Sequence, residues 1–413
     1  PAHRRGGVAA LAALSLIPVL AAPAVAVPRG DSPSLPGMPS AVAAGQPCTP
    51  ASKKSSSQLP WAQSFLNLPQ AWQLTRGAGV TVAVVDTGGD SERVPSLAGR
   101  VTAGPDVVSG GAARDDCVGH GTFLAGIVAG RKLDGTRTAG VAPEAKVLAI
   151  RATDKRGVTS PGALAKGVRA ATESGARVID VALSSGTSSA ALRTAVRAAQ
   201  DKGALVIAPA AAEDGGKGPS YPAALPGVLA VSSVGPGGAI PDTAGAADGA
   251  EAGVKGAAAP RLSAPGVSVT GPGPGGPGQF TGGGDAVAGA FVSGTAALVI
   301  SYHPRLTARQ VAHRLESTAY GASGDALDPI VGRGTVDPVQ AVSAVLPEEH
   351  ARPAAAPAVH PPAAMPPARS SDARDRSVLV AVGAGLAILL IAALGGVLPR
   401  GRRRGWRAGR ATG

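Results

Sequence analysis

Two polar side chains in the first third of the chain could do acid–base chemistry together. Asp86 directly follows the apolar run 82–85, and His120 lies in the sequence Gly-His-Gly-Thr. An imidazole exchanges protons near neutral pH, and a neighbouring carboxylate can orient the ring and stabilise its charged form. Each residue also fits a plainer role, Asp86 as a turn or helix-capping acid and His120 as a hydrogen-bonded loop residue. As a pair, they predict an acid–base site if the fold brings them together.

The segments around these residues alternate between expected strands and expected helices. Apolar runs predict strands at 80–85, 145–150, 177–183, 204–208 and 228–234. Helical patterns cover 123–129, 163–174, 190–202 and 287–302. This alternation predicts the α/β class, with a parallel sheet covered by helices on both faces. Asp86 would then lie at the carboxyl edge of the sheet, where ligands of such folds bind. We expect residues 235–284, which are rich in Gly and Pro, to be mostly loop.

Composition excludes several other classes of protein. The chain has 413 residues, of which 44% are hydrophobic, so it can bury a core. Its net charge of +12 is concentrated at the ends, with six arginines and no acid in residues 400–413. A terminal excess of this kind indicates targeting, and 2% aromatic residues argue against base stacking. We therefore expect no nucleic-acid partner, and the sequence indicates no cofactor, calcium site or other metal site.

Both ends of the chain carry membrane signals. Residues 1–26 combine a basic start, an apolar stretch and an Ala-x-Ala site, which predicts a secretory signal peptide, with an uncleaved anchor as the alternative. Residues 377–398 include a 21-residue uncharged stretch, about 31 Å long as a helix, which predicts a transmembrane span. The arginine-rich tail 399–413, starting at Pro399 where we expect the span to end, places the C-terminus in the cytoplasm.

Three regions are expected between these signals: an N-terminal extension at 27–57, a folded domain at 58–346 and a Pro/Ala-rich linker at 347–376. The prolines of the linker favour a semi-extended spacer. The sequence thus predicts a single-pass protein of the cell membrane whose ectodomain is extracellular.

Further motifs give the domain a family resemblance. The Asp and His motifs, together with the segments 141–145, 263–266 and 292–298, resemble those of subtilisin-like serine proteases of the S8 family. The segments Pro60-Trp61-Ala62-Gln63, Leu74-Thr75-Arg76-Gly77 and Asp116-Cys117, with the C-terminal anchor, resemble mycosins, the anchored S8 proteases of type VII secretion systems.

The resemblance has several implications. It implies a subtilisin-like fold over about 58–346, with Asp86 and His120 as the acid and base of a catalytic triad. It also implies type VII secretion membrane components as partners, and a peptide as ligand. A disulfide between Cys48 and Cys117 is implied as well, and two free thiols are the alternative.

The sequence departs from the family at the nucleophile. The family motif G-T-S-x-A-x-P precedes V-S-G, and counting back from Val292 puts Ala286 at the position of the serine. An alanine methyl group cannot attack a carbonyl, and loss of this serine from subtilisin costs about 10⁶ in kcat. The one substitute we considered, Ser293, lies about 10 Å further along the same helix.

Neighbouring site positions also differ. The family's oxyanion asparagine aligns with Ala212, or with Glu213 if one residue is inserted, and loss of that donor costs about 10² to 10³ in rate. We expect Asp285, in place of threonine, to cap the next helix and to oppose developing negative charge. The substrate-lining Ser-Leu-Gly aligns with Ala182, Leu183 and Ser184, and Asp180 replaces the asparagine before it.

These observations lead to one principal hypothesis, a catalytically inactive mycosin-like protein with a binding or scaffold role in type VII secretion. Two alternatives stay open. One is an active serine endopeptidase that uses an unrecognised nucleophile, and the other is a cell-surface peptide-binding module.

Overall fold

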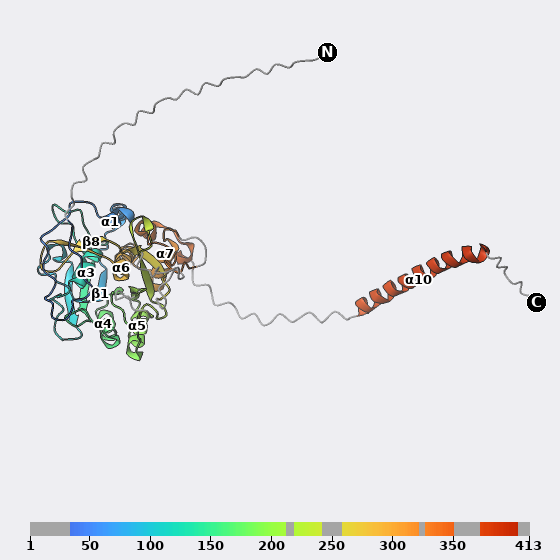
Figure 1. Ribbon diagram of the computed structural model, residues 1–413, viewed down its shortest axis with the longest axis horizontal. Coiled ribbons are helices and arrows are strands. Elements are labelled where there is room, and N and C mark those ends of the chain that lie inside the picture. The colour runs from blue at the N-terminus through green and yellow to red at the C-terminus, as the bar shows by residue number, and fades with distance from the viewer. Residues whose placement is uncertain (1–33, 212–218, 242–257, 322–326, 351–371, 404–413) are drawn as a thin grey trace, which may run out of the picture. The chain divides into compact units, whose positions relative to one another are not determined.

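The computed structural model describes residues 34–211, 219–241, 258–321, 327–350 and 372–403. The chain divides into two units, the first ending at Glu349 and the second beginning at His350. Figure 1 shows an α/β domain in the first unit and the helix α10 in the second. Each unit is described by itself below.

The domain is built on a seven-stranded sheet with the strand order β2-β3-β1-β4-β5-β6-β7. All neighbouring pairs in it are parallel. The strands are β1 (Thr81–Asp86), β2 (Val101–Asp106), β3 (Lys146–Arg151), β4 (Val178–Val181), β5 (Leu205–Pro209), β6 (Leu229–Val234) and β7 (Leu262–Pro265). A separate antiparallel pair consists of β8 (Val269–Pro272) and β9 (Gln279–Gly282). This topology confirms the predicted α/β, subtilisin-like fold class.

Helices cover both faces of the sheet. The helices before α10 are α1 (Trp61–Phe65), α2 (Leu68–Leu74), α3 (His120–Ala129), α4 (Pro161–Glu173), α5 (Ala190–Asp201), α6 (Asp285–Tyr302), α7 (Ala308–Ser317), α8 (Pro338–Ser343) and α9 (Pro347–His350), with short 3₁₀ helices η1 (Pro95–Leu97) and η2 (Pro236–Gly238). The central strand β1 has apolar side chains on both faces. Val82 and Val84 join the core under α3 and α6, whereas Ala83 and Val85 join the core under α4 and α5. Figure 1 shows α4 and α5 side by side on one side of the sheet.

The strands at the two edges of the sheet were not predicted. β2 contains Pro105, and β7, which ends at Pro265, lies within residues 235–284, for which we expected mostly loop. Proline is tolerated at the edge of a sheet, where one side of the strand needs no partner. Short edge strands with Pro and Gly therefore lack the continuous β-branched pattern that reveals the central strands.

The second unit contains the helix α10 (Asp372–Arg403). It begins inside the predicted linker and continues past Pro399, where we expected the span to end. Two helices of the described residues are long and apolar enough to cross a membrane. In α6 83% of the apolar window is buried, so α6 is the core helix of the domain, whereas the window Asp375–Gly396 is 0% buried.

The remaining predicted regions are the linker, the signal peptide and the basic tail. The first four residues of the predicted linker form α9, which packs on the domain through the buried side chain of Glu349. The predicted signal peptide 1–26 and the end of the basic tail lie outside the described residues.

Candidate functional site

Asp86 and His120 meet in the interior of the domain. Asp86 ends β1, His120 begins α3, and both side chains are buried. Nδ1 of His120 lies 3.0 Å from each carboxylate oxygen of Asp86. Oδ1 of Asp86 also accepts hydrogen bonds from the N–H of Thr87 at 2.7 Å and from its hydroxyl at 3.0 Å. These donors suit an ionised carboxylate that orients the imidazole, which is the geometry of an acid–base pair.

The glycines of the His motif make this approach possible. A Cβ atom on Gly121 would lie 2.2 Å from the carbonyl oxygen of Gly88, so only glycine lets α3 begin so close to the end of β1. Gly119 has a φ of 90°, which disfavours other residues. The carboxylate of Asp116 accepts hydrogen bonds from the N–H groups of Gly119 and Thr122 at 2.7 and 2.8 Å, which holds this turn in place.

The strand order makes this point a candidate ligand site. β3 and β4 lie on opposite sides of β1, and the order of the strands reverses there. Ligands of open α/β sheets bind outside the carboxyl ends of the strands at such a reversal. The loops that follow β3 and β4 therefore flank Asp86. The second of these loops begins with Ala182, Leu183 and Ser184, of which Ala182 is buried and the other two are half-buried.

Ala286 is the second residue of α6, and its exposed fraction is 0%. The N-terminus of α6 lies at the carboxyl ends of β5 and β6, because Asp285 bonds to the backbone there. Ser293 lies deeper in the same helix and is also fully buried, beside Asp180. Ala212, the predicted oxyanion position, lies outside the described residues.

The prediction that Asp285 caps α6 is wrong. The N-cap is Gly284, and Asp285 is the first helical residue. Its carboxylate instead accepts hydrogen bonds from the N–H of Ala211 at 2.9 Å and from the N–H of Ser233 at 2.8 Å. Ser233 belongs to β6 and Ala211 follows β5, so neither donor belongs to the helix, which sequence patterns alone do not reveal.

Asp180 is the most perturbed acid near the pair. It lies on β4 with an exposed fraction of 0%, and neither of its oxygens has a hydrogen-bond partner among the described residues. Burial, and next the negative charge of Asp86, raise the pKa of Asp180 to about 8, although Ser293 and His120 oppose the shift. Asp180 is therefore mostly a neutral carboxylic acid at pH 7. The sequence identified it only as a replacement for asparagine.

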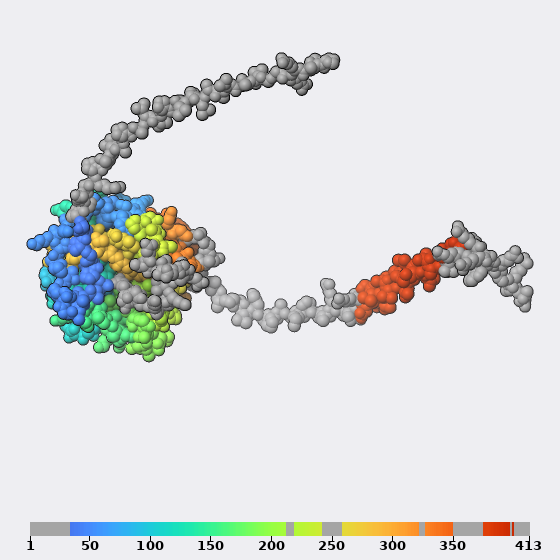
Figure 2. Space-filling view, in the orientation of Figure 1, coloured from blue at the N-terminus to red at the C-terminus, as the bar shows by residue number. Residues whose placement is uncertain are grey.

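The N-terminal extension is bonded to the rim of this site. Cys48 and Cys117 form a disulfide, and the N–H of Thr49 donates to the carbonyl of Cys117 at 2.9 Å. Further up the chain, the N–H of Met38 donates to the carbonyl of Thr281 in β9 at 2.8 Å. In Figure 2 the blue N-terminal segments cover part of one face of the domain. The disulfide thus attaches the extension to Cys117, which lies three residues before His120.

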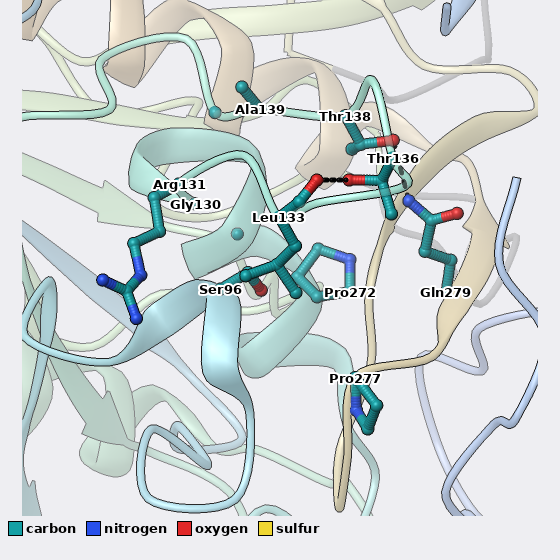
Figure 3. A pocket seen from close by; sticks show the side chains of 12 residues that line it. Ser96, Gly130, Arg131, Leu133, Thr136, Thr138, Ala139, Pro272, Pro277 and Gln279 are labelled. Carbon is teal, nitrogen blue, oxygen red and sulfur yellow. Dashed lines mark hydrogen bonds between the residues drawn. The ribbon is translucent and has the colours of Figure 1, made fainter. Parts of the chain in front are cut away.

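A separate shallow pocket, with about 330 Å³ of empty space, lies near the C-terminal end of α3, whereas His120 begins this helix. Figure 3 shows the loop 131–140 on one side of it and Pro272, Pro277 and Gln279 on the other. Its polar groups bond to one another, since Nε2 of Gln279 donates to the hydroxyl of Thr138 at 2.8 Å. No group of three acidic, histidine or cysteine side chains suited to a metal ion occurs in the part of the chain that the structure describes.

Comparison with known proteins identifies the family. Residues 77–337 match the model of the subtilase family, Peptidase S8. The chain is 33% identical to mycosin-4 of Mycobacterium tuberculosis over 96% of its own length and 95% of the relative's. It is 36% identical to thermitase of Thermoactinomyces vulgaris over 41% of this chain and 60% of thermitase.

Solved structures agree with these matches. The structure of a serine protease MycP1, an essential component of the type VII (ESX-1) secretion system, superimposes with a TM-score of 0.60 and 28% identity. The match covers 76% of this chain and 97% of MycP1. The chain therefore belongs to the subtilase family of peptidases and, within it, to the mycosins.

Proposed function

We propose that this mycosin is a membrane-anchored protein that binds rather than cleaves, and that it has a scaffold role in type VII secretion. The proposal rests mainly on the sequence motif, which aligns Ala286 with the nucleophile of the family. The side chain of Ala286 has no oxygen and is fully buried. An acid and a base do not hydrolyse a peptide by this mechanism without a nucleophile.

The retained pair has a structural use that needs no turnover. Asp86 and His120 link the end of β1 to the start of α3 in the interior of the domain. A buried ionised carboxylate costs free energy unless it is hydrogen-bonded, and His120 and Thr87 provide its donors. Loss of the imidazole would leave this carboxylate with fewer partners.

The placement in the membrane is part of the same proposal. A signal peptide at 1–26 directs the extension and the domain 58–346 to the outside, and the span at 377–398 anchors them. The apolar window Asp375–Gly396, no part of which is buried, supports a span. The arginine-rich tail 399–413 favours a cytoplasmic C-terminus.

Labelling with a fluorophosphonate tests the absence of catalysis. The full chain, purified in detergent, is expected to remain unlabelled under conditions in which an active subtilisin is labelled completely. The variant His120→Ala is the matched control. Labelling of the unaltered chain that disappears in His120→Ala would show an active endopeptidase with another nucleophile, and would refute the proposal.

Co-purification tests the scaffold role. Tagged full-length protein is expected to retain membrane components of the secretion system, and a chain that ends before α10 is expected to lose them. Retention of peptides by both forms, with no membrane partner for either, would instead favour the peptide-binding module.

A further inference from the structure

The strands β5 and β6 separate just where the site begins. Their ladder pairs Ile207 with Leu229 and ends with the pair of Pro209 and Val231. The same register, continued by two residues, would place Ala211 opposite Ser233. In parallel strands beyond such an end, the backbone N–H groups need other acceptors. Ser233 in β6 and Ala211, two residues after β5, thus each have a backbone N–H group that needs an acceptor outside this ladder.

The carboxylate of Asp285 lies between these two residues. Its Oδ2 accepts from the N–H of Ala211 at 2.9 Å, and its Oδ1 accepts from the N–H of Ser233 at 2.8 Å. One side chain therefore satisfies both donors, with one oxygen for each. Charge-assisted hydrogen bonds of this kind are stronger than bonds between neutral groups.

Other side chains fit this arrangement less well. A threonine hydroxyl has a single oxygen, and an asparagine has one acceptor oxygen while its NH₂ group would face the second donor. A carboxylate offers one acceptor oxygen to each of the two donors, which explains why an aspartate suits this position.

We propose that Asp285 is a positioning residue: its carboxylate acts as an internal ligand that fixes the separated ends of β5 and β6. This proposal rests on the two hydrogen bonds and goes beyond the proposed function, since it does not depend on the absence of hydrolysis.

Chemical rescue by a small carboxylate tests the proposal. In the full-length protein, Asp285→Ala is expected to lower Tm by about 4–8 °C, because two charge-assisted hydrogen bonds are lost. Formate is expected to restore part of this loss in a saturable way, and chloride at equal ionic strength is not. Asp285→Asn is expected to lie between the unaltered protein and Asp285→Ala.

Asp337→Ala provides the matched control. Asp337 also accepts a backbone hydrogen bond, from the N–H of Gln340 at 3.0 Å, but it does so as an ordinary cap of α8. Formate is expected to have no specific effect on this variant.

Two results would overturn the inference. The first is an unchanged Tm in both Asp285 variants, and the second is a formate effect no larger than that of chloride. If Asp285→Ala does not fold, the test uses Asp285→Asn instead. An unchanged Tm in Asp285→Asn would refute the proposal that one carboxylate serves both donors. Labelling of the unaltered chain by a fluorophosphonate would refute the proposed function but leave the rescue experiment valid, so the two failures are distinguishable.

Discussion

Asp86 and Asp180 are both fully buried carboxyl groups, but their surroundings differ. Asp86 accepts hydrogen bonds from Thr87 and faces the imidazole of His120. Asp180 lies on the neighbouring strand β4, and a Cβ atom on Gly289 of α6 would lie 3.4 Å from its Oδ1. Burial raises the pKa of Asp180 to about 8, so this acid is mostly neutral at pH 7.

This raised pKa predicts how stability depends on pH. Folded Asp180 holds its proton up to about pH 8, whereas the unfolded group, with a pKa of 3.8, releases it much earlier. The bound proton therefore stabilises the folded state fully below pH 3.8, and this stabilisation is lost as the pH rises to about 8. Asp180→Asn removes the titration, so the free energy of unfolding of the unaltered protein should fall relative to this variant by up to about 1.4 kcal/mol per pH unit.

Urea unfolding of both proteins across this pH range measures the effect. Asp154→Asn is the control. Burial raises the pKa of Asp154, but hydrogen bonds from the backbone N–H groups of Val158 and Arg156 lower it, and the net shift is downward. The titration of Asp154 therefore lies below the tested range. Parallel stability curves for Asp180→Asn and the unaltered protein would contradict the prediction.

At the scale of elements, the sequence predicted the centre of the sheet better than its edges. β1 and α6 were evident because a strand or helix buried on all sides must be apolar throughout. β2 and β7 were missed because edge strands tolerate Pro and Gly. Within the site, the positions of Asp86 and His120 followed from short motifs. The partners of Asp285 did not, because Ala211 and Ser233 donate through their backbone, which leaves no pattern in the side chains.

The close approach of α3 to β1 gives a prediction at this scale. In Gly121→Ala the new Cβ would lie 2.2 Å from the backbone oxygen of Gly88, so α3 must shift away from β1 and strain the Asp86–His120 pair. We expect the free energy of unfolding to fall by about 1–3 kcal/mol, as for other overpacked core sites.

Gly162→Ala serves as the matched glycine control in the comparison of unfolding curves. Its Cβ would meet nothing closer than Ser160 Oγ at 3.9 Å, and alanine favours the helix α4 by up to about 1 kcal/mol. A similar effect of both substitutions would show that the contact with Gly88 is unimportant.

At the scale of the whole molecule, a buried arginine joins several helices near the end of the first unit. Arg314 of α7 has a side chain that is 1% exposed, and it forms a two-pronged ion pair with Glu349 of α9, which is 4% exposed. The same guanidinium donates to the carbonyls of Ala341 and Ala344 at 3.1 and 2.8 Å. One side chain thus joins α7, the end of α8 and α9, the last element of the first unit.

Arg314→Met is therefore expected to weaken this junction strongly. The carboxylate of Glu349 would stay buried without its cation, which costs about 3–5 kcal/mol in other proteins, and α9 should become sensitive to protease. The neighbouring pair of His313 and Glu348 is half-exposed, so His313→Gln should have little effect on the free energy of unfolding. Unfolding curves and limited proteolysis of the full chain compare the two variants. The double variant Arg314→Met with Glu349→Met should recover part of the lost free energy of unfolding, because no charge is then left buried. Equal losses in the single and double variants would contradict this role of the ion pair.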